Sequence, residues 1–593
     1  MLKFLQNVLA SLLGTLIALG AVSIIGGVLV SAIVFVSLME DEEEVTVEDQ
    51  SVLVMDLSTP IRDSQPIETV AEAIIDESSW LNLRQTIATL EAAAADDRIT
   101  ALFLDGSWGD SGAGYAVLKE LRPALEAFKA AEKPIIAYDV TWTEREYYLG
   151  SIADEIFIHP IGLMDLNGLS AEEMFLAQAL EKFGIGVQVI RVGSFKAAVE
   201  PFLTDKFSPE NREQLTALLG ELWQEFLMIA AKNRQMTPTR LQEIIAKGGG
   251  LLAEDAKNQG LVDETAYFDE VASRLRELTA ETEEGARPFR QVSVESYHAL
   301  ELYDPADAGS GGKIALVYAE GEIVYGEGEL EQIGSDRLRE QLRDLRLDDE
   351  IKAVVLRVNS PGGSATASEI IFRELHLLQQ TKPVIVSMGN IAASGGYWIA
   401  TASDQIFAQA NTITGSIGVF GILPNFGKIG NDNGITWDVV KTAPFADIDT
   451  VTRPKTEAEL AQYQAFVDHI YDLFLQKVGE SRELPQAKVS DIAQGRVWSG
   501  VAAKKIGLVD QIGGLEAAIA YAAEAAELGD DWQVEEYQNE ATFEELLLRS
   551  LAIEQDSPLT QQWNQLQEQL RLFKSLNDPR AAYALWPFDL QID

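Results

Sequence analysis

The chain has 593 residues, of which 47% are hydrophobic and 23% charged, a composition that allows large buried cores. Its 46 lysine and arginine residues stand against 93 aspartate and glutamate residues, which gives a formal net charge of −47 at pH 7. Such a charge repels phosphate backbones, so nucleic acid is not an expected partner. Cysteine is absent, which excludes disulfides, thiol nucleophiles and thiolate metal sites.

The chain begins with a long apolar segment. No residue from Phe4 to Met39 is charged, and this run exceeds the ~20 apolar residues that cross a bilayer. A cleaved signal peptide has an apolar region of only about 7 to 15 residues, so residues 1–46 are predicted to form a retained single-pass transmembrane anchor with an acidic end. Lys3 precedes the run and the acidic residues 40–44 follow it, so the positive-inside tendency places the bulk of the chain outside the cytoplasm.

The remainder of the chain contains an internal repeat. Five segments recur in the same order: 96–106 with 348–358, 133–140 with 382–389, 151–160 with 401–410, 187–192 with 437–442, and 258–264 with 505–511. Both copies alternate short β-branched runs with helical segments, which is typical of parallel strands joined by crossover helices. The sequence therefore predicts a tandem duplication of an α/β unit.

Composition suggests the boundaries of these units. Residues 47–280 form the first predicted unit and residues 313–530 the second. The Gly-, Pro- and Asp-containing stretch 281–312 between them is predicted to be a linker. Residues 531–593 contain two amphipathic patterns and are predicted to form a helical tail that packs on the body or on a neighbouring subunit.

Metal and histidine chemistry is not expected. The four histidines are far apart in the sequence and form no metal-ligand spacing: His159, His298, His376 and His469. No cofactor motif is present either, because Gly311–Lys313 lacks the spacing of a phosphate-binding loop. The tetrapeptide at 109–112 is similar to the serine motif of chymotrypsin-type proteases, but it follows a strand of an α/β unit and is interpreted as a chance match.

Two loops of the second unit have the composition of an acyl-transfer site. Residues 359–363, Asn-Ser-Pro-Gly-Gly, follow a strand and open a helix, where backbone amides favour negative charge. Residues 392–397, Ala-Ala-Ser-Gly-Gly-Tyr, follow the next strand. Small residues around Ser394 leave room for a substrate backbone, and the amide of Gly395 is a candidate oxyanion donor. Either loop alone is equally consistent with an ordinary tight turn.

These loops, together with the segments Thr-Ile-Thr-Gly-Ser-Ile-Gly-Val-Phe-Gly at 412–421 and Arg-Val-Gly-Ser-Phe-Lys-Ala-Ala-Val-Glu-Pro-Phe at 191–202, resemble the long, tandem-repeat type of bacterial signal peptide peptidase A, or protease IV. The resemblance covers nearly the whole chain. It implies a crotonase-like (Clp-protease-like) fold in each unit, a homotetramer, and hydrolysis of remnant signal peptides and other hydrophobic peptides at the outer, periplasmic side of the bacterial inner membrane.

The resemblance also implies roles for individual residues. The nucleophile falls on Ser394, the general base on Lys196, and the residue that positions the lysine on Ser416. The repeat provides an independent check: at an offset of 250 these residues face Glu144, Ala446 and Leu166, respectively. Because each unit lacks what the other retains, one catalytic site per chain is expected, assembled either across the two repeats or across subunits. The resemblance implies assembly across the two repeats within one chain.

The implied chemistry is a serine endopeptidase with a lysine base and an acyl-enzyme intermediate. Burial would lower the pKa of Lys196 from its ordinary value of about 10.4, so that the neutral amine accepts the serine proton. The amides of Gly395 and Gly363 would bind the oxyanion, with Gly362 as the alternative to Gly363.

Other assignments remain open at this point. The rival base is Lys206 and the rival nucleophiles are Ser360 and Ser364. The structural alternative for Lys196 is a surface ion pair with Glu200, one helical turn on, against which the repeat register and the family motif both argue. Two other functions are consistent with crotonase-like units. The first is a non-proteolytic membrane scaffold, because half-sites have decayed in both units. The second is acyl-thioester chemistry, which a body outside the cytoplasm disfavours.

Overall fold

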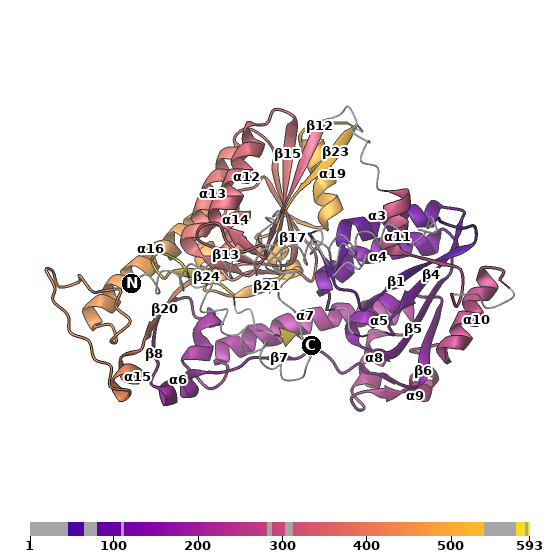
Figure 1. The fold of residues 1–593 in the computed structure, drawn as a ribbon, viewed down its shortest axis with the longest axis horizontal. Coiled ribbons are helices and arrows are strands. Elements are labelled where there is room, and N and C mark those ends of the chain that lie inside the picture. The colour runs from indigo at the N-terminus through magenta and orange to yellow at the C-terminus, as the bar shows by residue number, and fades with distance from the viewer. Residues whose placement is uncertain are drawn as a thin grey trace, which may run out of the picture.

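A computed structural model of the chain describes residues 46–64, 80–107, 109, 112–281, 287–302, 312–529, 531–538, 577–586 and 591–592. Two α/β units lie side by side, and the first unit extends the long helix α7 (Pro209–Asn233) beneath the second (Figure 1). Residues 1–45 of the predicted anchor lie outside the described residues. Within the described part of the chain, no helix has both the length and the apolar character to cross a membrane.

The first unit is built on a seven-stranded sheet. Its main path runs β10, β6, β5, β4, β1, β11 with all neighbours parallel, and β9 pairs antiparallel with β6. The bounds are β1 (Ser51–Asp56), β4 (Ile99–Asp105), β5 (Ile135–Trp142), β6 (Glu155–Met164), β9 (Leu251–Leu252), β10 (Glu264–Thr265) and β11 (Gln291–Ser293). Strands β2 (Ile61–Arg62) and β3 (Leu81–Asn82) form a separate pair.

Helices cover both faces of this sheet, which is why its central strands β1, β4 and β5 are mostly apolar. In β4, Leu102 and Leu104 belong to one apolar cluster, while Ala101 and Phe103 point to the opposite face and belong to another. The helices of the unit are α3 (Leu83–Ala95), α4 (Tyr115–Ala130), α5 (Glu144–Gly150), α6 (Ala177–Phe183), the 3-10 helix η1 (Ala197–Phe202), α7, α8 (Pro238–Ile245), α9 (Ala253–Asn258), α10 (Phe268–Leu278) and α11 (Val294–Glu301).

The second unit repeats this architecture. Its eight-stranded sheet follows the order β21, β19, β17, β15, β12, β23, with β18 and β22 attached beside β17. The strands are β12 (Gly312–Glu320), β15 (Ile351–Ser360), β17 (Val384–Ala393), β18 (Gln405–Ala408), β19 (Ile413–Gly415), β21 (Val497–Ser499), β22 (Gln511–Ile512) and β23 (Trp532–Tyr537). The helices are α12 (Ser335–Leu347), α13 (Ala365–Gln379), α14 (Gly395–Ala400), α15 (Gly427–Asp432), α16 (Glu457–Ser481), α17 (Gln486–Ile492), α18 (Gly500–Ile506) and α19 (Leu515–Ala525).

A third sheet joins the two units. It has six strands in the order β14, β13, β16, β24, β20, β8, and only β8 comes from the first unit. The bounds are β14 (Gln332–Gly334), β13 (Glu322–Val324), β16 (Gly362–Ser364), β24 (Tyr583–Leu585), β20 (Val419–Asn425) and β8 (Gly186–Val192). Strand β8 pairs antiparallel with β20 over seven residue pairs, from Val419 with Val192 to Asn425 with Gly186. This pairing carries the chain after β8 into the second unit.

The structure bears out the two α/β repeats, because the elements of the units correspond in order. Strands β4, β5 and β6 match β15, β17 and β18, helix α6 matches α15, α7 matches α16, and α10 matches α19. One predicted repeat pair differs: residues 187–192 lie in β8, whereas 437–442 form no regular element.

Two predicted boundaries change. The stretch 281–312 contains β11 and α11, and β11 adds a parallel strand beside β1, so it is part of the first unit as well as a connection. The predicted helices of the 531–593 tail fall within residues 539–576, which the structure does not describe. The described tail segments form strands: β23 extends the second sheet, β24 enters the third, and β25 (Gln591–Ile592) pairs with β7 (Ala171–Glu172). Strands of two or three residues are too short for periodicity to reveal.

Candidate active site

Ser394 lies at the junction of β17 and α14. Its backbone has φ +56° and ψ −112°, a conformation that residues with a side chain rarely adopt. Its amide donates to the carbonyl of Gly415, and its own carbonyl accepts from the amide of Trp398 in the first turn of α14. Such strain is typical of functional turns and needs a rigid surrounding to hold it. Here the surrounding is a core in which Ser394 has no solvent exposure.

Lys196 enters the second unit directly after β8. The amide of Phe195 donates to the carbonyl of Gln494 at 2.9 Å and anchors the segment. A side-chain β-carbon at Gly495 would lie 2.6 Å from Cβ of Lys196, and one at Gly418 would lie 3.2 Å from its Cδ. These two glycines therefore leave the space for the lysine stem, and the side chain is 1% exposed.

The lysine amine meets both predicted serines. Its Nζ lies 2.5 Å from Oγ of Ser394, 3.0 Å from Oγ of Ser416 and 3.0 Å from the carbonyl oxygen of Ser416. Burial lowers the pKa of Lys196 well below its ordinary value. Like Ser394, Ser416 has a positive φ, +50°, which turns both its side chain and its carbonyl toward the amine. The structure thus brings Ser394, Lys196 and Ser416 into one buried cluster.

The glycine loops lie against this cluster. A β-carbon at Gly362 would lie 2.5 Å from the amide nitrogen of Gly395, so the two backbones approach closely. Gly362 is the alternative oxyanion donor to Gly363. Its amide already donates to Oγ of Ser360 at 3.1 Å. Gly363, at φ +155°, lies within β16 between Ile323 of β13 and Ala584 of β24. Its role and that of Gly395 remain predictions.

The chain's own strand β24 fills the gap between β16 and β20. Gly363 pairs with Ala584 and Ser364 with Tyr583 in antiparallel register, while Phe420 of β20 pairs with Tyr583 from the other side. A β-carbon at Gly395 would lie 3.0 Å from the carbonyl oxygen of Ala584. An extended peptide backbone can therefore lie beside the Ser394 turn.

The rival residues have other partners. Oγ of Ser364 donates to Asp578 and caps α13 by accepting from the amide of Ala367. Ser360 accepts from Gly362 as described, and Lys206 is exposed. The carboxylate of Glu200 accepts from the Ser208 amide and the Asn211 side chain, and the Lys196 amine is instead bound to the serines. The predicted alternative of a Lys196–Glu200 ion pair is therefore wrong.

The corresponding position of the first unit is closed. Glu144, the counterpart of Ser394, is 9% exposed and its Oε1 accepts from the amides of Asn167 and Gly168 at 2.5 and 2.8 Å. Burial raises the pKa of Glu144, although these two amides oppose the shift. Leu166, the counterpart of Ser416, is buried. A carboxylate bound by two amides thus takes the place of a hydroxyl.

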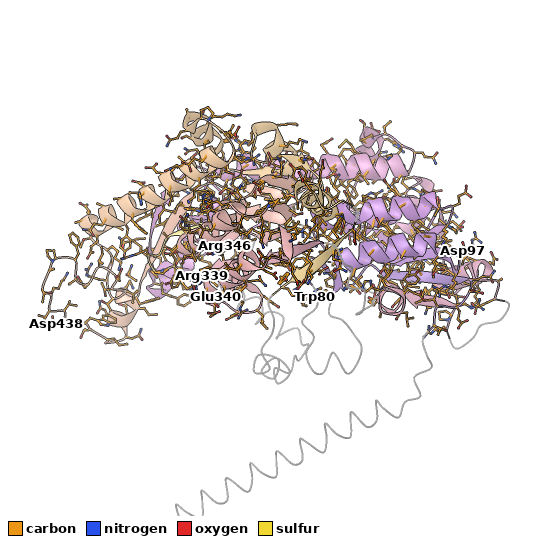
Figure 2. All side chains as sticks on the ribbon, turned by 90° about the horizontal axis from the view of Figure 1, so that it is seen from above. Trp80, Asp97, Arg339, Glu340, Arg346 and Asp438 are labelled. Carbon is orange, nitrogen blue, oxygen red and sulfur yellow. The ribbon has the colours of Figure 1, made fainter. Side chains whose placement is uncertain are left out.

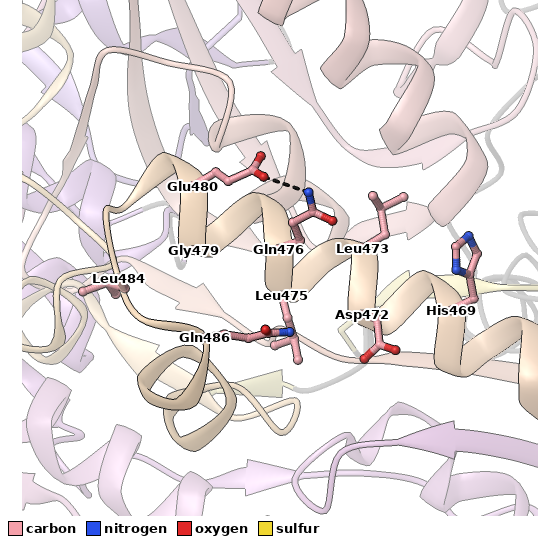
Figure 3. Close-up of a pocket in the computed structure, with 9 residues that line it drawn as sticks. All are labelled: His469, Asp472, Leu473, Leu475, Gln476, Gly479, Glu480, Leu484 and Gln486. Carbon is pink, nitrogen blue, oxygen red and sulfur yellow. Dashed lines mark hydrogen bonds between the residues drawn. The ribbon is translucent and has the colours of Figure 1, made fainter.

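A cavity lies apart from the Ser394 cluster. It has a volume of about 580 Å³ and lies along α16 and the start of α17, lined by polar and apolar side chains such as His469, Asp472 and Gln476 (Figure 3). No cluster of His, Cys, Asp or Glu able to hold a metal ion occurs among the described residues. His298 faces Thr89 at 3.3 Å, and burial lowers the pKa of this imidazole.

Known proteins resemble the chain over both units. The sequence profile described as peptidase family S49 matches residues 127–282 and 376–529, which together make up more than half of the chain. The chain belongs to peptidase family S49. A second profile, described as Clp protease, matches residues 313–413 of the S49 chain. This match agrees with the Clp-protease-like fold expected for the units.

Three relatives of this S49 chain are informative. Protease 4 of Salmonella typhi is 37% identical over 514 residues, which cover 83% of this chain and 81% of the relative. Protease 4 of Haemophilus influenzae is 35% identical, covering 84% and 83%. The chloroplastic serine protease SPPA of Arabidopsis thaliana is 33% identical, covering 76% and 67%. The resemblance to tandem-repeat protease IV is therefore confirmed, and the chain is a serine-type peptidase of family S49.

Sequence reasoning missed several residues that support the cluster. Gln494 and Gly495 hold and accommodate the lysine segment, and Gln214 of α7 links the units by donating to the Phe195 carbonyl and accepting from the Val497 amide. The sequence signal for these residues is Gly495, which lies just before β21. A glycine before a strand occurs at many turns, so it does not single out a functional position. Their importance depends on contacts between residues about 280 positions apart, as for Gln214 and Val497.

Proposed function

We propose that this S49 peptidase is a membrane-anchored endopeptidase that uses Ser394 as nucleophile and Lys196 as general base. It would hydrolyse hydrophobic peptides, including cleaved signal peptides, through an acyl-enzyme. The observation that carries the proposal is the 2.5 Å contact between the buried amine and the Ser394 hydroxyl. A neutral amine at this distance can accept the proton as the hydroxyl attacks.

The proposed reaction has two stages. In the first, Oγ of Ser394 attacks the scissile carbonyl, its proton moves to Nζ of Lys196, and the C–N bond breaks as that proton passes to the leaving amine. In the second, Lys196 takes a proton from a water molecule as that water attacks the carbonyl carbon of the ester. The bond to Oγ of Ser394 then breaks, the peptide acid leaves, and the proton returns from Nζ to Oγ. Ser416 holds the amine in place through its hydroxyl and carbonyl. Amides of Gly395 and Gly363 would stabilise the oxyanion, each worth about 3 kcal/mol by comparison with other oxyanion donors.

The substrate is proposed to bind as a β-strand. Strand β24 occupies a position between β16 and β20 in which alternate side chains can enter pockets while backbone groups pair. A peptide segment in the same place would present an extended backbone to Ser394. The β24 side chains that fill this place, Tyr583 and Leu585, belong to one apolar cluster with Phe420 of β20, so the place suits a hydrophobic peptide.

Location and assembly extend the same proposal. The uncharged run from Phe4 to Met39 supports a single-pass anchor in the bacterial inner membrane, with the catalytic body on the periplasmic side. The resemblance to protease IV supports a homotetramer. On the periplasmic side of the inner membrane, the expected partners are the membrane itself and remnant signal peptides. No cofactor is expected.

The proposed nucleophile predicts a covalent adduct. The full chain in detergent micelles should react with a serine-directed fluorophosphonate, and mass spectrometry should locate the adduct on Ser394. Lys196→Ala should lose most of the labelling, because the hydroxyl then lacks its base. Lys206→Ala is the matched control and should label like the wild type. A wild-type chain that stays unlabelled while folded would favour the non-proteolytic scaffold. An adduct on Ser360 or Ser364 would show that this serine, and not Ser394, is the nucleophile.

The lysine base also predicts a pH profile. Since the base works as a neutral amine, kcat/KM should rise with pH through the lowered pKa of Lys196 and then level off. Below that pKa the rate should fall about tenfold per pH unit. An uncharged peptide substrate isolates the enzyme's own titration. Glu144→Gln, which alters the buried carboxyl of the first unit, should leave the profile unchanged, whereas a rate that is highest in acid would contradict an amine base.

A further inference from the structure

One segment of the second unit lacks the strand pairing that its repeat counterpart makes in the first unit. In the first unit, residues 186–192 form β8 and pair with β20 of the second unit. The corresponding residues of the second unit are 436–442, at the repeat offset of 250. They lie in a segment, residues 434–446, that projects from the body next to α15. We call this segment the arm.

The arm is exposed along its whole length. Residues 431–446 are all exposed, including Trp437 at 43%, Val439 at 49% and Val440 at 98%. The comparison within the repeat is direct: Ile190, the counterpart of Val440 in the docked strand, is 5% exposed. Figure 1 shows the segment after α15 reaching away from the units, and Figure 2 shows Asp438 at that extremity. Apolar side chains so exposed indicate a contact surface.

The base of the arm is held firmly. Asp447 forms ion pairs with Lys441 and with Arg453, the latter at 3.0 Å, and Arg453 also pairs with Glu459 at 2.7 Å. Glu459 in turn completes the capping box at the start of α16. These contacts fix the base of the arm to the start of α16, so the arm projects from the body in a defined direction and can pair with a strand of another molecule.

The partner surface is also identified by the repeat. Residues 169–175 correspond to β20 and contain β7. Strand β20 lies between β24 and β8, whereas β7 has only β25 beside it among the described strands. Its second edge has no strand partner in the part of the chain described. Met174, beside this edge, is 55% exposed, and Phe183 on the following helix α6 is 64% exposed.

We infer that the arm of one chain forms an antiparallel strand on residues 169–175 of a second copy of this chain. The register of β8 on β20, shifted by the repeat offset, places Val440 opposite Ala171 and Trp437 opposite Met174. Each chain offers one arm and one acceptor edge, so the contact is head-to-tail and generates a ring or an open filament. The exposed apolar residues of the arm would then be buried as Ile190 is within the chain.

This junction differs chemically from the one within the chain. The arm brings Ala446 where β8 brings Lys196, and the acceptor unit holds Glu144 where the second unit holds Ser394. The contact between copies therefore carries no base and no nucleophile. Its role is assembly, which is independent of the catalytic proposal and can be tested apart from it.

Cysteine cross-linking tests the pairing without background, because the chain has no cysteine. Chains carrying Ala171→Cys and chains carrying Val440→Cys, with different tags, are produced together as full-length protein in membranes and oxidised. The pairing predicts a disulfide-linked heterodimer as the main product, and no cross-link when either variant is oxidised alone. Leu347→Cys, at another exposed apolar position, is the matched control and should not link to Ala171→Cys.

Other outcomes would overturn the pairing. A homodimer of Val440→Cys alone would indicate that two arms contact each other. The absence of any cross-link in catalytically active membranes would indicate that the arm does not pair with residues 169–175 and contacts something else, such as lipid. Sedimentation of the detergent-solubilised chain gives a second measurement. Val440→Asp should lower the assembled mass, Leu347→Asp should not, and Asp438→Asn should strengthen assembly, because the register places Asp438 opposite Glu173.

Discussion

Replacing Lys196 with methionine is expected to abolish peptide hydrolysis while the protein remains folded. The substitution keeps an unbranched side chain in the space beside Gly418 and Gly495 but removes the amine from Ser394. Removing one member of such a catalytic unit costs on the order of 10⁴-fold or more in kcat. Ser394→Ala should have an effect of the same order. The measurement is kcat and KM with a hydrophobic peptide whose cleavage releases a fluorophore.

The pair of variants also distinguishes cooperation from independent effects. Because the two side chains act in one proton transfer, the double variant should be about as slow as the slower single variant, not slower by the product of the two losses. Thermal unfolding serves as the folding control. Since burial opposes the charged form of Lys196, its folded-state pKa is lowered, and the unfolded state binds more protons at neutral pH. Lys196→Met should therefore be no less stable than the wild type at pH 7. Retention of substantial activity by either single variant would refute the dyad.

The sequence was sufficient for the architecture where signals are local. The buried strands β4 and β15 are continuous apolar runs, and their internal similarity shows the duplication without any structure. The position of Ser394 follows from a strand, a small-residue turn and a helix in immediate succession. By contrast, nothing in the segment 194–197 distinguishes Lys196 from a surface lysine. Its prediction depended on the family motif and on Ala446 in the other repeat.

The remaining features depend on distant contacts. Strand β24 joins β16 across more than 200 residues of chain, and β8 crosses from one unit to the other. Three-residue strands such as β24 and β11 carry no usable periodicity, so the tail was expected to be helical and the stretch at 281–312 a linker. Segments that pair at long range are those for which composition is least informative. They are also the segments that assemble the cluster around Lys196.

Because the lysine and the serine come from different repeats, the contact between the units should matter for activity. One buried part of this contact is Arg357 of β15, which has a side-chain exposure of 0%. One guanidinium nitrogen lies 2.7 Å from Asp63 and 2.7 Å from Glu120, both of the first unit. Glu120 also accepts from the amide of Leu515 at 2.6 Å. Burial raises the pKa of Glu120, and the neighbouring charge of Asp63 acts in the same direction, while Arg357 opposes it.

Arg357→Met is therefore expected to destabilise the protein strongly. It leaves two buried acidic side chains without their cation, a change that costs about 3–5 kcal/mol of unfolding free energy. Denaturant unfolding of the wild type and the variant measures this loss. Arg84→Met is the matched control, because Arg84 also bridges the units, to Glu516 at 3.2 Å and Glu536 at 2.9 Å, but its side chain is 31% exposed. Such a partly exposed pair is worth about 0–1 kcal/mol.

A compensated variant shows whether charge or packing is responsible. Adding Asp63→Asn and Glu120→Gln to Arg357→Met removes all three charges from the buried cluster and should recover much of the lost stability, since neutral replacements of buried ion clusters are often tolerated. If Arg357→Met unfolds at the same denaturant concentration as the wild type, the cluster does not stabilise the contact between the repeats. If the compensated variant recovers stability together with hydrolysis, holding the repeats in contact is what keeps Lys196 within reach of Ser394.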